Sequence, residues 1–269
     1  MTALALLNAL ATNEQLEQSP SRRDGIKKET EQILLSFGCE LIQSAGIALK
    51  LRQVVTSTAQ VLFQRFFRVA SLKHFGIQEI GMAALFLASK TEESLVRISS
   101  LTMVYNYLIQ RARRWEIVPL DGFSQQSYDM KNDLVVAEMQ ILKHLAFDVS
   151  VQLPYGLMVN YLRILGLEDH PDVPNKAWGY LNDGLRTIIY VAYHPPTIAC
   201  ASIWLACREL QIKLPTQPGA QWWELFEADI MDIQDIAGHI QSQYYLKYDP
   251  SSVPLTTDEL ADQLSSHRR

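Results

Sequence analysis

The sequence predicts an all-α protein with two consecutive five-helix domains, each built around one buried central helix. Apolar residues recur at spacings of three and four along most of the chain, and few stretches alternate polar with apolar residues. The length of 269 residues suits two domains of ordinary size. In addition, the segments 80–90 and 198–208 align without a gap at an offset of 118 residues.

This internal repeat identifies the expected central helices. Ile80–Lys90 reads IGMAALFLASK and Ile198–Arg208 reads IACASIWLACR, with a large ring at Phe86 and Trp204 and a cation closing each segment. Both segments are apolar all round and rich in small residues, which predicts helices that neighbouring helices surround on every side. The repeat is too long for a solenoid unit, so a helical scaffold of stacked short repeats is disfavoured.

The first domain is expected at 26–150, after a flexible arm at 1–25, whose segment Asn13–Asp24 is polar and contains Pro20. Its apolar stripes predict five helices, at Lys27–Leu49, Leu51–Val69, Ile77–Glu93, Arg97–Arg113 and Gln126–Ala146.

The pattern then restarts in a second domain, expected at 151–247. Proline and glycine residues delimit helices at Pro154–Leu165, Asn175–Tyr193, Thr197–Leu210, Trp222–Phe226 and Ile230–Lys247. Trp222 and Trp223 are adjacent, so we expect one in the second core and the other on a contact surface. The polar tail 248–269 is expected to be flexible, with one helical turn near Asp258–Leu264.

Charge and composition exclude several classes of protein. The net charge is −5; segment 27–149 carries 14 basic and 12 acidic residues, whereas 150–247 carries 6 and 10. Duplex-DNA binders usually have a strongly basic domain, so direct nucleic-acid binding is not expected. No apolar run of 18 residues predicts a membrane span. Three cysteines without a pairing framework indicate a reducing compartment.

Motifs for catalysis are also missing from the sequence. The six histidines and three cysteines show no metal-binding spacing, and we find no phosphate loop, dinucleotide fingerprint or nucleophile elbow. The chain also lacks the glycine-rich, His-Arg-Asp and Asp-Phe-Gly segments of a protein kinase. We therefore expect a non-enzymatic protein with no cofactor and no metal.

Two motifs resemble the cyclin box. Phe86–Glu93 (FLASKTEE) resembles its third-helix signature, and Glu138–Phe147 (EMQILKHLAF) resembles its fifth-helix signature. Within that family, four longer stretches look more like cyclin L than like cyclins T, K or C: Gly38–Leu51, Ala59–Phe67, Ala177–Arg186 and Thr197–Pro215. The resemblance covers about residues 19–247 and implies a tandem cyclin fold.

The resemblance implies a nuclear subunit that binds and activates a cyclin-dependent protein kinase in RNA polymerase II transcription and pre-mRNA splicing. It also implies kinase contacts at Lys90 and Glu138. Independently, helical phase places Glu138 on the apolar face of its helix, where a carboxylate needs a cation, solvent or a partner protein. Lys90 is the expected cation, and a surface bridge to Lys143 is the alternative. The other expected contact residues are Glu92, Glu93, Leu95 and Ile98.

The sequence departs from the family pattern at three places. Ser94 follows the paired acids where many cyclin L proteins have proline, and no Arg/Ser-rich tail follows residue 247. The first-helix docking motif of cell-cycle cyclins is replaced by Cys39–Leu49, so substrate recruitment there is not implied. Two alternatives stay open: a cyclin of the K, T or C type, and a DNA-binding general transcription factor with tandem cyclin folds.

Overall fold

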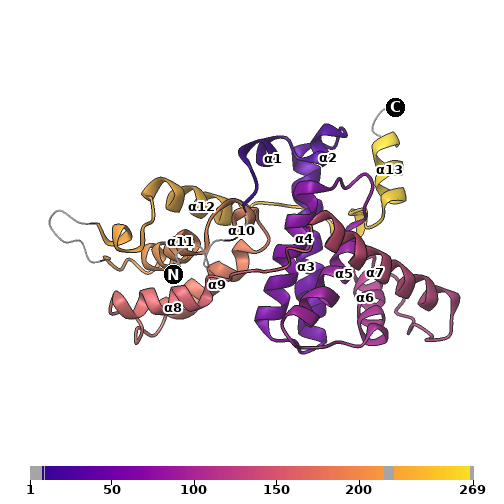
Figure 1. Ribbon diagram of the computed structural model, residues 1–269, viewed down its shortest axis with the longest axis horizontal. Helices are drawn as coiled ribbons and strands as arrows, with labels where there is room; N and C mark the ends of the chain where they lie inside the picture. The colour runs from indigo at the N-terminus through magenta and orange to yellow at the C-terminus, as the bar shows by residue number, and fades with distance from the viewer. Residues whose placement is uncertain (1–7, 9, 215–220, 267–269) are drawn as a thin grey trace. The chain divides into compact units, whose positions relative to one another are not determined.

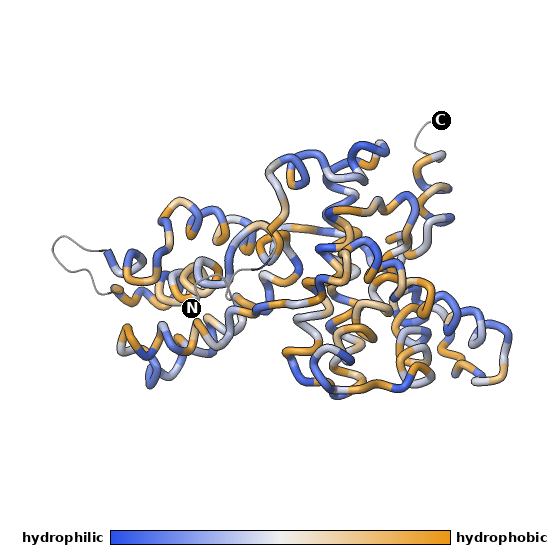
Figure 2. The backbone as a smooth tube through the Cα atoms, in the orientation of Figure 1, coloured by the Kyte–Doolittle hydropathy of each residue, from blue (hydrophilic) through white to orange (hydrophobic). Residues whose placement is uncertain are grey.

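The computed structural model describes residues 8, 10–214 and 221–266, and every regular element in these ranges is helical (Figure 1). This confirms the predicted all-α class. The chain divides into two compact units. We call residues 11–151 with 247–266 the first unit, and residues 152–246 with Asn8 and Leu10 the second unit. Most helices carry both polar and apolar residues (Figure 2), as expected where one face is buried.

The first unit is built around one central helix, α5 (Ile77–Thr91). Every residue from Ile80 to Ser89 is buried. Four helices surround α5, namely α3 (Lys28–Ala48), α4 (Gln53–Val69), α6 (Ile98–Ala112) and α7 (Gln125–His144). The small residues of α5 permit this enclosure because they let neighbouring backbones approach closely.

Close approach is also visible between α3 and α4. A Cβ atom built on Gly38 of α3 would lie 2.3 Å from the Phe63 ring of α4. Non-bonded carbon atoms do not approach so closely, so only glycine fits at this position without moving the ring. Phe63 in turn packs edge-on against Phe67, with ring centroids 5.0 Å apart.

The second unit repeats the design around α11 (Pro195–Glu209). Its neighbours are α8 (Tyr155–Ile164), α9 (Val173–Gly184), α10 (Ile189–Ala192), the 3-10 helix η2 (Trp222–Phe226) and α12 (Ile230–Gln243).

One continuous helix over Asn175–Tyr193 was predicted, and this is wrong. The chain breaks between α9 and α10, where a Cβ on Gly184 would lie 2.5 Å from Ile189 Cδ1. The buried Tyr190 hydroxyl donates a hydrogen bond to the carbonyl of Leu181 at 2.9 Å, which fixes the fold-back. The contacts of Ile189 and Tyr190 with the end of α9 depend on the tertiary structure, so helical periodicity could not predict the break.

The predicted flexible arm is also wrong where the structure describes it. The segment forms two short helices, α1 (Asn13–Glu17) and α2 (Pro20–Arg23). The buried carboxylate of Glu31 accepts hydrogen bonds from Ser19 Oγ at 2.5 Å and Arg22 Nε at 2.7 Å. Arg68 Nη2 of α4 lies 3.7 Å from the same carboxylate. Polar composition predicted disorder, but a buried carboxylate provides the contacts that order this arm.

The predicted flexible tail is wrong for 248–266 as well. This segment forms η3 (Pro250–Ser252) and α13 (Thr257–Ser266), and three of its apolar side chains are buried in the first core: Val253, Leu255 and Leu260. The Leu255 carbonyl accepts a hydrogen bond from the Gln78 amide at the start of α5, at 3.2 Å. The helical turn expected near Asp258–Leu264 is part of α13.

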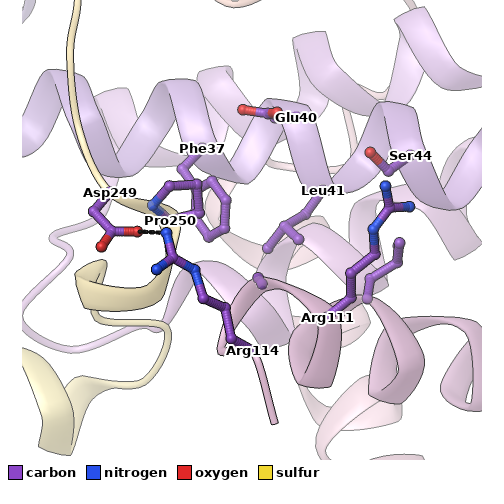
Figure 3. Close-up of a pocket in the computed structure, with 10 residues that line it drawn as sticks. Phe37, Glu40, Leu41, Ser44, Arg111, Arg114, Asp249 and Pro250 are labelled. Carbon is purple, nitrogen blue, oxygen red and sulfur yellow. Dashed lines mark hydrogen bonds and ion pairs between the residues drawn. The ribbon is translucent and has the colours of Figure 1, made fainter. Parts of the chain in front are cut away.

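The beginning of the tail lies across α3 and α6. The Tyr248 ring stands edge-on to Phe37, and its hydroxyl donates to Glu40 Oε2 at 2.8 Å. Asp249 pairs with Arg114 at 3.3 Å beside a pocket of about 300 Å³ (Figure 3). These contacts attach the tail to the first unit.

Candidate partner-binding site

The predicted pairing of Lys90 with Glu138 is confirmed. Lys90, near the end of α5, places its Nζ 2.7 Å from Glu138 Oε1 and 2.9 Å from Oε2 on α7. The Lys90 side chain is 42% exposed and that of Glu138 is 13% exposed. Glu138 is therefore paired with the central helix rather than with Lys143.

An aromatic ring fixes the lysine from its other side. Lys90 Nζ lies 4.1 Å from the centroid of the Phe86 ring, one helical turn earlier on α5. The ammonium group is thus held between a carboxylate and the face of an aromatic ring, both of which favour positive charge. A surface ion pair of this kind contributes at most about 1 kcal/mol to folding stability. The contribution of this pair to folding stability is therefore too small to explain its well-defined geometry.

Glu92 ties the end of α5 to α4. Its Oε1 accepts a hydrogen bond from Thr58 Oγ1 at 2.8 Å, and its backbone carbonyl accepts one from Arg52 Nη2 at 2.9 Å. Glu92 is only half-exposed. Glu92, which was expected to contact the partner, therefore holds the end of α5 against α4.

Glu93 and Leu95 are accessible, whereas Ile98 is partly enclosed. Glu93 adopts the left-handed conformation, with φ of 52°, that closes many helices. Glu93 is exposed, and Leu95 exposes 81% of its surface. Ile98 is the first residue of α6 and packs partly against the core. The structure therefore leaves Glu93 and Leu95 free to touch a partner and gives Ile98 a supporting position.

Sequence reasoning missed an apolar stripe on the outer face of α7. Val135, Val136 and Met139 are 52%, 60% and 57% exposed, and they lie beside Glu138 in sequence. The buried face of the same helix is formed by other residues, among them Leu134 and Ile141. A signal was present, because α7 has more apolar positions than one buried stripe requires.

The structure offers no membrane or metal chemistry in its described ranges. None of the helices there combines the length and apolarity that crossing a bilayer would need. Likewise, no three His, Cys, Asp or Glu side chains in those ranges are grouped to hold a metal ion. Cys39, Cys200 and Cys207 are buried, and none of the three forms a disulfide in the described ranges. What the candidate site presents is an ion pair, further carboxylates and apolar side chains, which suit the binding of another protein.

Comparison with known proteins agrees with this interpretation. The family model described as the cyclin N-terminal domain matches residues 6–150. Human Cyclin-L2 is 40% identical over 244 residues, which cover 91% of this chain and 46% of that protein. Cyclin-L1 of Danio rerio is 41% identical over 242 residues, covering 90% of this chain and 48% of its own. The chain therefore spans less than half the length of these two relatives.

Solved structures share the fold. A chain in the crystal structure of the yeast RNA Pol II CTD kinase CTDK-1 complex matches with a TM-score of 0.71 at 15% identity, covering 97% of this chain and 84% of that one. A chain of the yeast TFIIK (Kin28/Ccl1/Tfb3) complex matches with a TM-score of 0.58 at 17% identity, covering 86% and 96%. At these identities the likeness shows the architecture, two helical domains with surrounded central helices.

Proposed function

Since the chain belongs to the cyclin family, we propose that it is the regulatory subunit of a cyclin-dependent protein kinase that acts in RNA polymerase II transcription. The similarity to Cyclin-L1 and Cyclin-L2, and to a chain in an RNA Pol II CTD kinase complex, supports this assignment. The finer part of the proposal is a nuclear location, a role in pre-mRNA splicing, and no catalytic group of its own. The resemblance to cyclin L supports these parts.

The proposed mechanism is a shift in the conformational equilibrium of the kinase. An inactive kinase holds its regulatory helix away from the lysine that orients the ATP phosphates. A rigid surface that fits only the inward position of this helix increases the active population. Moving that equilibrium from about 1:99 to 99:1 requires roughly 5.5 kcal/mol of differential binding. The buried, enclosed α5 and the α7 packed on it provide such a rigid support.

One observation carries the proposal: the fixed Lys90–Glu138 pair lies beside exposed apolar side chains on α7. The pair contributes little to stability, and exposed apolar stripes are characteristic of surfaces that bind other proteins. We assign polar contacts with the kinase to Lys90, Glu93 and Glu138. Apolar contacts are assigned to Leu95 and, beyond the sequence-based set, to Val135, Val136 and Met139. Glu92 and Ile98 position these groups.

A DNA-binding role is disfavoured by charge. A DNA-binding factor with tandem cyclin folds needs a basic surface, whereas segment 150–247 carries 10 acidic and 6 basic residues. A gel-shift titration against duplex DNA at increasing salt should show no specific complex.

The decisive experiment is purification of the chain from its own cells at low salt, followed by identification of the bound kinase by mass spectrometry. We expect a cyclin-dependent kinase in near-equimolar amount, with activity on RNA polymerase II tail peptides. The Glu138→Lys chain is the matched bait, and it should recover no kinase. Equal recovery on both baits, or recovery on neither, would contradict the proposed function.

A further inference from the structure

The central helices of the two units end in the same way. In the first, Lys90 Nζ lies 4.1 Å above the Phe86 ring; in the second, the Arg208 guanidinium lies 4.9 Å above the Trp204 ring. Both rings and both cations are related by the 118-residue repeat of the sequence. The repeat thus preserves an arrangement of side chains and not only a fold.

The backbone repeats as well. Glu93 and Gln211, which are equivalent in the repeat, both adopt the left-handed conformation, with φ of 52° and 58°. The amide that follows each of them donates a 2.8 Å hydrogen bond back to the last helical turn, from Ser94 to the Ser89 carbonyl and from Ile212 to the Cys207 carbonyl. The second unit therefore presents its terminal cation in the same local frame as the proposed kinase-binding end of α5.

The two cations differ in what neutralises them. Lys90 is paired with Glu138, whereas the exposed Arg208 has no ion-pair or hydrogen-bond partner in the described part of the chain. The neighbouring carboxylate does not serve it, because Glu209 accepts hydrogen bonds from Lys176 Nζ at 2.5 Å and from the Tyr180 hydroxyl at 2.6 Å. Arg208 therefore presents an uncompensated, planar cation that can hold a carboxylate or phosphate through two parallel hydrogen bonds.

This cation borders an aromatic pocket of about 340 Å³. Arg208 is the single charged residue among its described lining residues, and the others include Trp204, Cys207, Ile212, Trp222 and Trp223. Trp222 is buried and Trp223 is half-exposed, as their adjacency predicted. Their rings meet nearly at a right angle, with centroids 5.8 Å apart.

The three tryptophans also offer hydrogen-bond donors. None of the indole N–H groups of Trp204, Trp222 and Trp223 has an acceptor in the described structure, and none of them is a fully buried orphan. Trp204 and Trp223 are half-exposed, so their N–H groups can reach acceptors outside the chain, whereas Trp222 is only 4% exposed. Aromatic faces with free indole donors suit an extended peptide in the polyproline conformation, whose rings stack on tryptophan and whose carbonyls lack internal partners.

We infer that this pocket, which we call the Trp204 pocket, binds a short, extended, acidic peptide containing proline from a partner protein. The proline or a neighbouring aliphatic residue packs against the tryptophans, the indole N–H groups of Trp204 and Trp223 donate to the peptide backbone, and Arg208 pairs with the acidic side chain. The site lies entirely within the second unit and makes no use of Lys90 or Glu138. It is thus a second docking surface, additional to the proposed kinase contact.

The test is a screen of the full 269-residue chain against a phage-displayed library of random 12-residue peptides. Enriched sequences should combine proline with an adjacent Asp or Glu. The best peptide is then synthesised with a fluorophore, and its affinity is measured by fluorescence polarisation. Arg208→Glu and Trp223→Ala should each weaken binding by about tenfold or more. Lys213→Glu is the matched control, because Lys213 is exposed, carries the same charge and does not line the pocket; its affinity should stay within about twofold.

Replacement of the peptide's acidic residue separates the possible anions. A phosphoserine that binds more tightly than the carboxylate assigns the pocket to phosphorylated segments, and weaker binding assigns it to acidic ones. Lysine at the same place should abolish binding. Retained binding of the lysine peptide, or a library enrichment that is identical for the Arg208→Glu chain, would overturn the inference. Kinase recovery by the Arg208→Glu chain should be unchanged, so failure of this inference and failure of the proposed function are distinguishable. Circular dichroism verifies the fold of each variant.

Discussion

The Lys90 ammonium group lies within 2.9 Å of both carboxylate oxygens of Glu138, across the contact between α5 and α7. The two residues are 48 positions apart in sequence. Because each belongs to a different helix of the first unit, the pair reports the relative placement of those helices. A partner that binds both residues therefore binds only when α5 and α7 are correctly packed.

Reversing the charge of Glu138 should abolish kinase binding. In Glu138→Lys, two cations face each other where an ion pair stood, and the surface offered to the kinase loses its carboxylate. We expect loss of kinase co-precipitation and of kinase activation while the helical content is retained, with about 0.5–3 kcal/mol lost in stability because the Glu138 side chain is only 13% exposed. Glu116→Lys makes the same charge change at an exposed loop position and should leave both readouts intact.

The apolar stripe on α7 should contribute to affinity rather than to folding. Met139 is 57% exposed, so Met139→Asp should weaken kinase binding by about tenfold or more while the melting temperature stays nearly unchanged. Met139→Leu keeps the apolar surface and should bind normally. Asn132→Asp, an exposed position on the same helix, controls for added charge. A large drop in melting temperature for Met139→Asp would instead assign this residue to the core.

The first unit should lose stability between mildly acidic and neutral pH through Glu79. Burial, with further contributions from Asp133, Glu259 and Asp258, raises the pKa of this carboxyl from 4.5 to about 6. One of its oxygens is buried without a hydrogen-bond partner. The folded state therefore holds the proton more tightly than the unfolded state, so the stabilisation is complete below pH 4.5 and is lost as the pH rises through about 6.

Denaturant titrations at pH 4.5 and pH 7.5 check this prediction. Glu79→Gln should raise the free energy of unfolding by up to about 2 kcal/mol at pH 7.5 and change it little at pH 4.5. The exposed Glu116→Gln should show no such pH-dependent gain. A stabilisation by Glu79→Gln that is equal at both pH values would contradict the proposed titration.

The tail should stabilise the first unit through buried side chains. Leu260 of α13 is only 3% exposed, and Leu260→Ala should cost about 2–4 kcal/mol of unfolding free energy, because it leaves a cavity in the core. Asp262→Ala removes an exposed side chain from the same helix and should be nearly neutral. Equal melting temperatures for the two variants would show that the tail is not docked.

The N-terminal arm should be released by loss of the Glu31 carboxylate. Arg68 is buried, and burial lowers the pKa of its guanidinium while Glu31 opposes that shift. Glu31→Gln leaves this cation without its counter-charge and should cost about 3–5 kcal/mol. Limited proteolysis should then cut within 13–24, a segment that we expect to be protected in the wild-type chain. Glu29→Gln, an exposed change on the same helix, should preserve protection.

Local sequence patterns were sufficient to predict the central helices, and they narrowed the partner of Glu138 to two lysines. A helix that is apolar on every side has to be surrounded, so the segments at 80–90 and 198–208 predicted α5 and α11 directly. Helical phase placed Glu138 on the apolar face of its helix, where Lys90 was the expected cation and a surface bridge to Lys143 was the alternative. Both conclusions depend on spacings of a few residues, which the sequence displays.

The sequence by itself determined the helical class and the duplication, and it named Lys90 as the expected partner of Glu138. Only the tertiary structure decided that Leu260 is buried, that Met139 is exposed and that Arg208 is left without a counter-charge. Periodicity shows that a residue can be buried, but burial itself requires a second surface. For Leu260 that surface is supplied by helices distant in the chain. For Met139 and Arg208, no distant element of the described chain supplies a covering surface or a counter-charge.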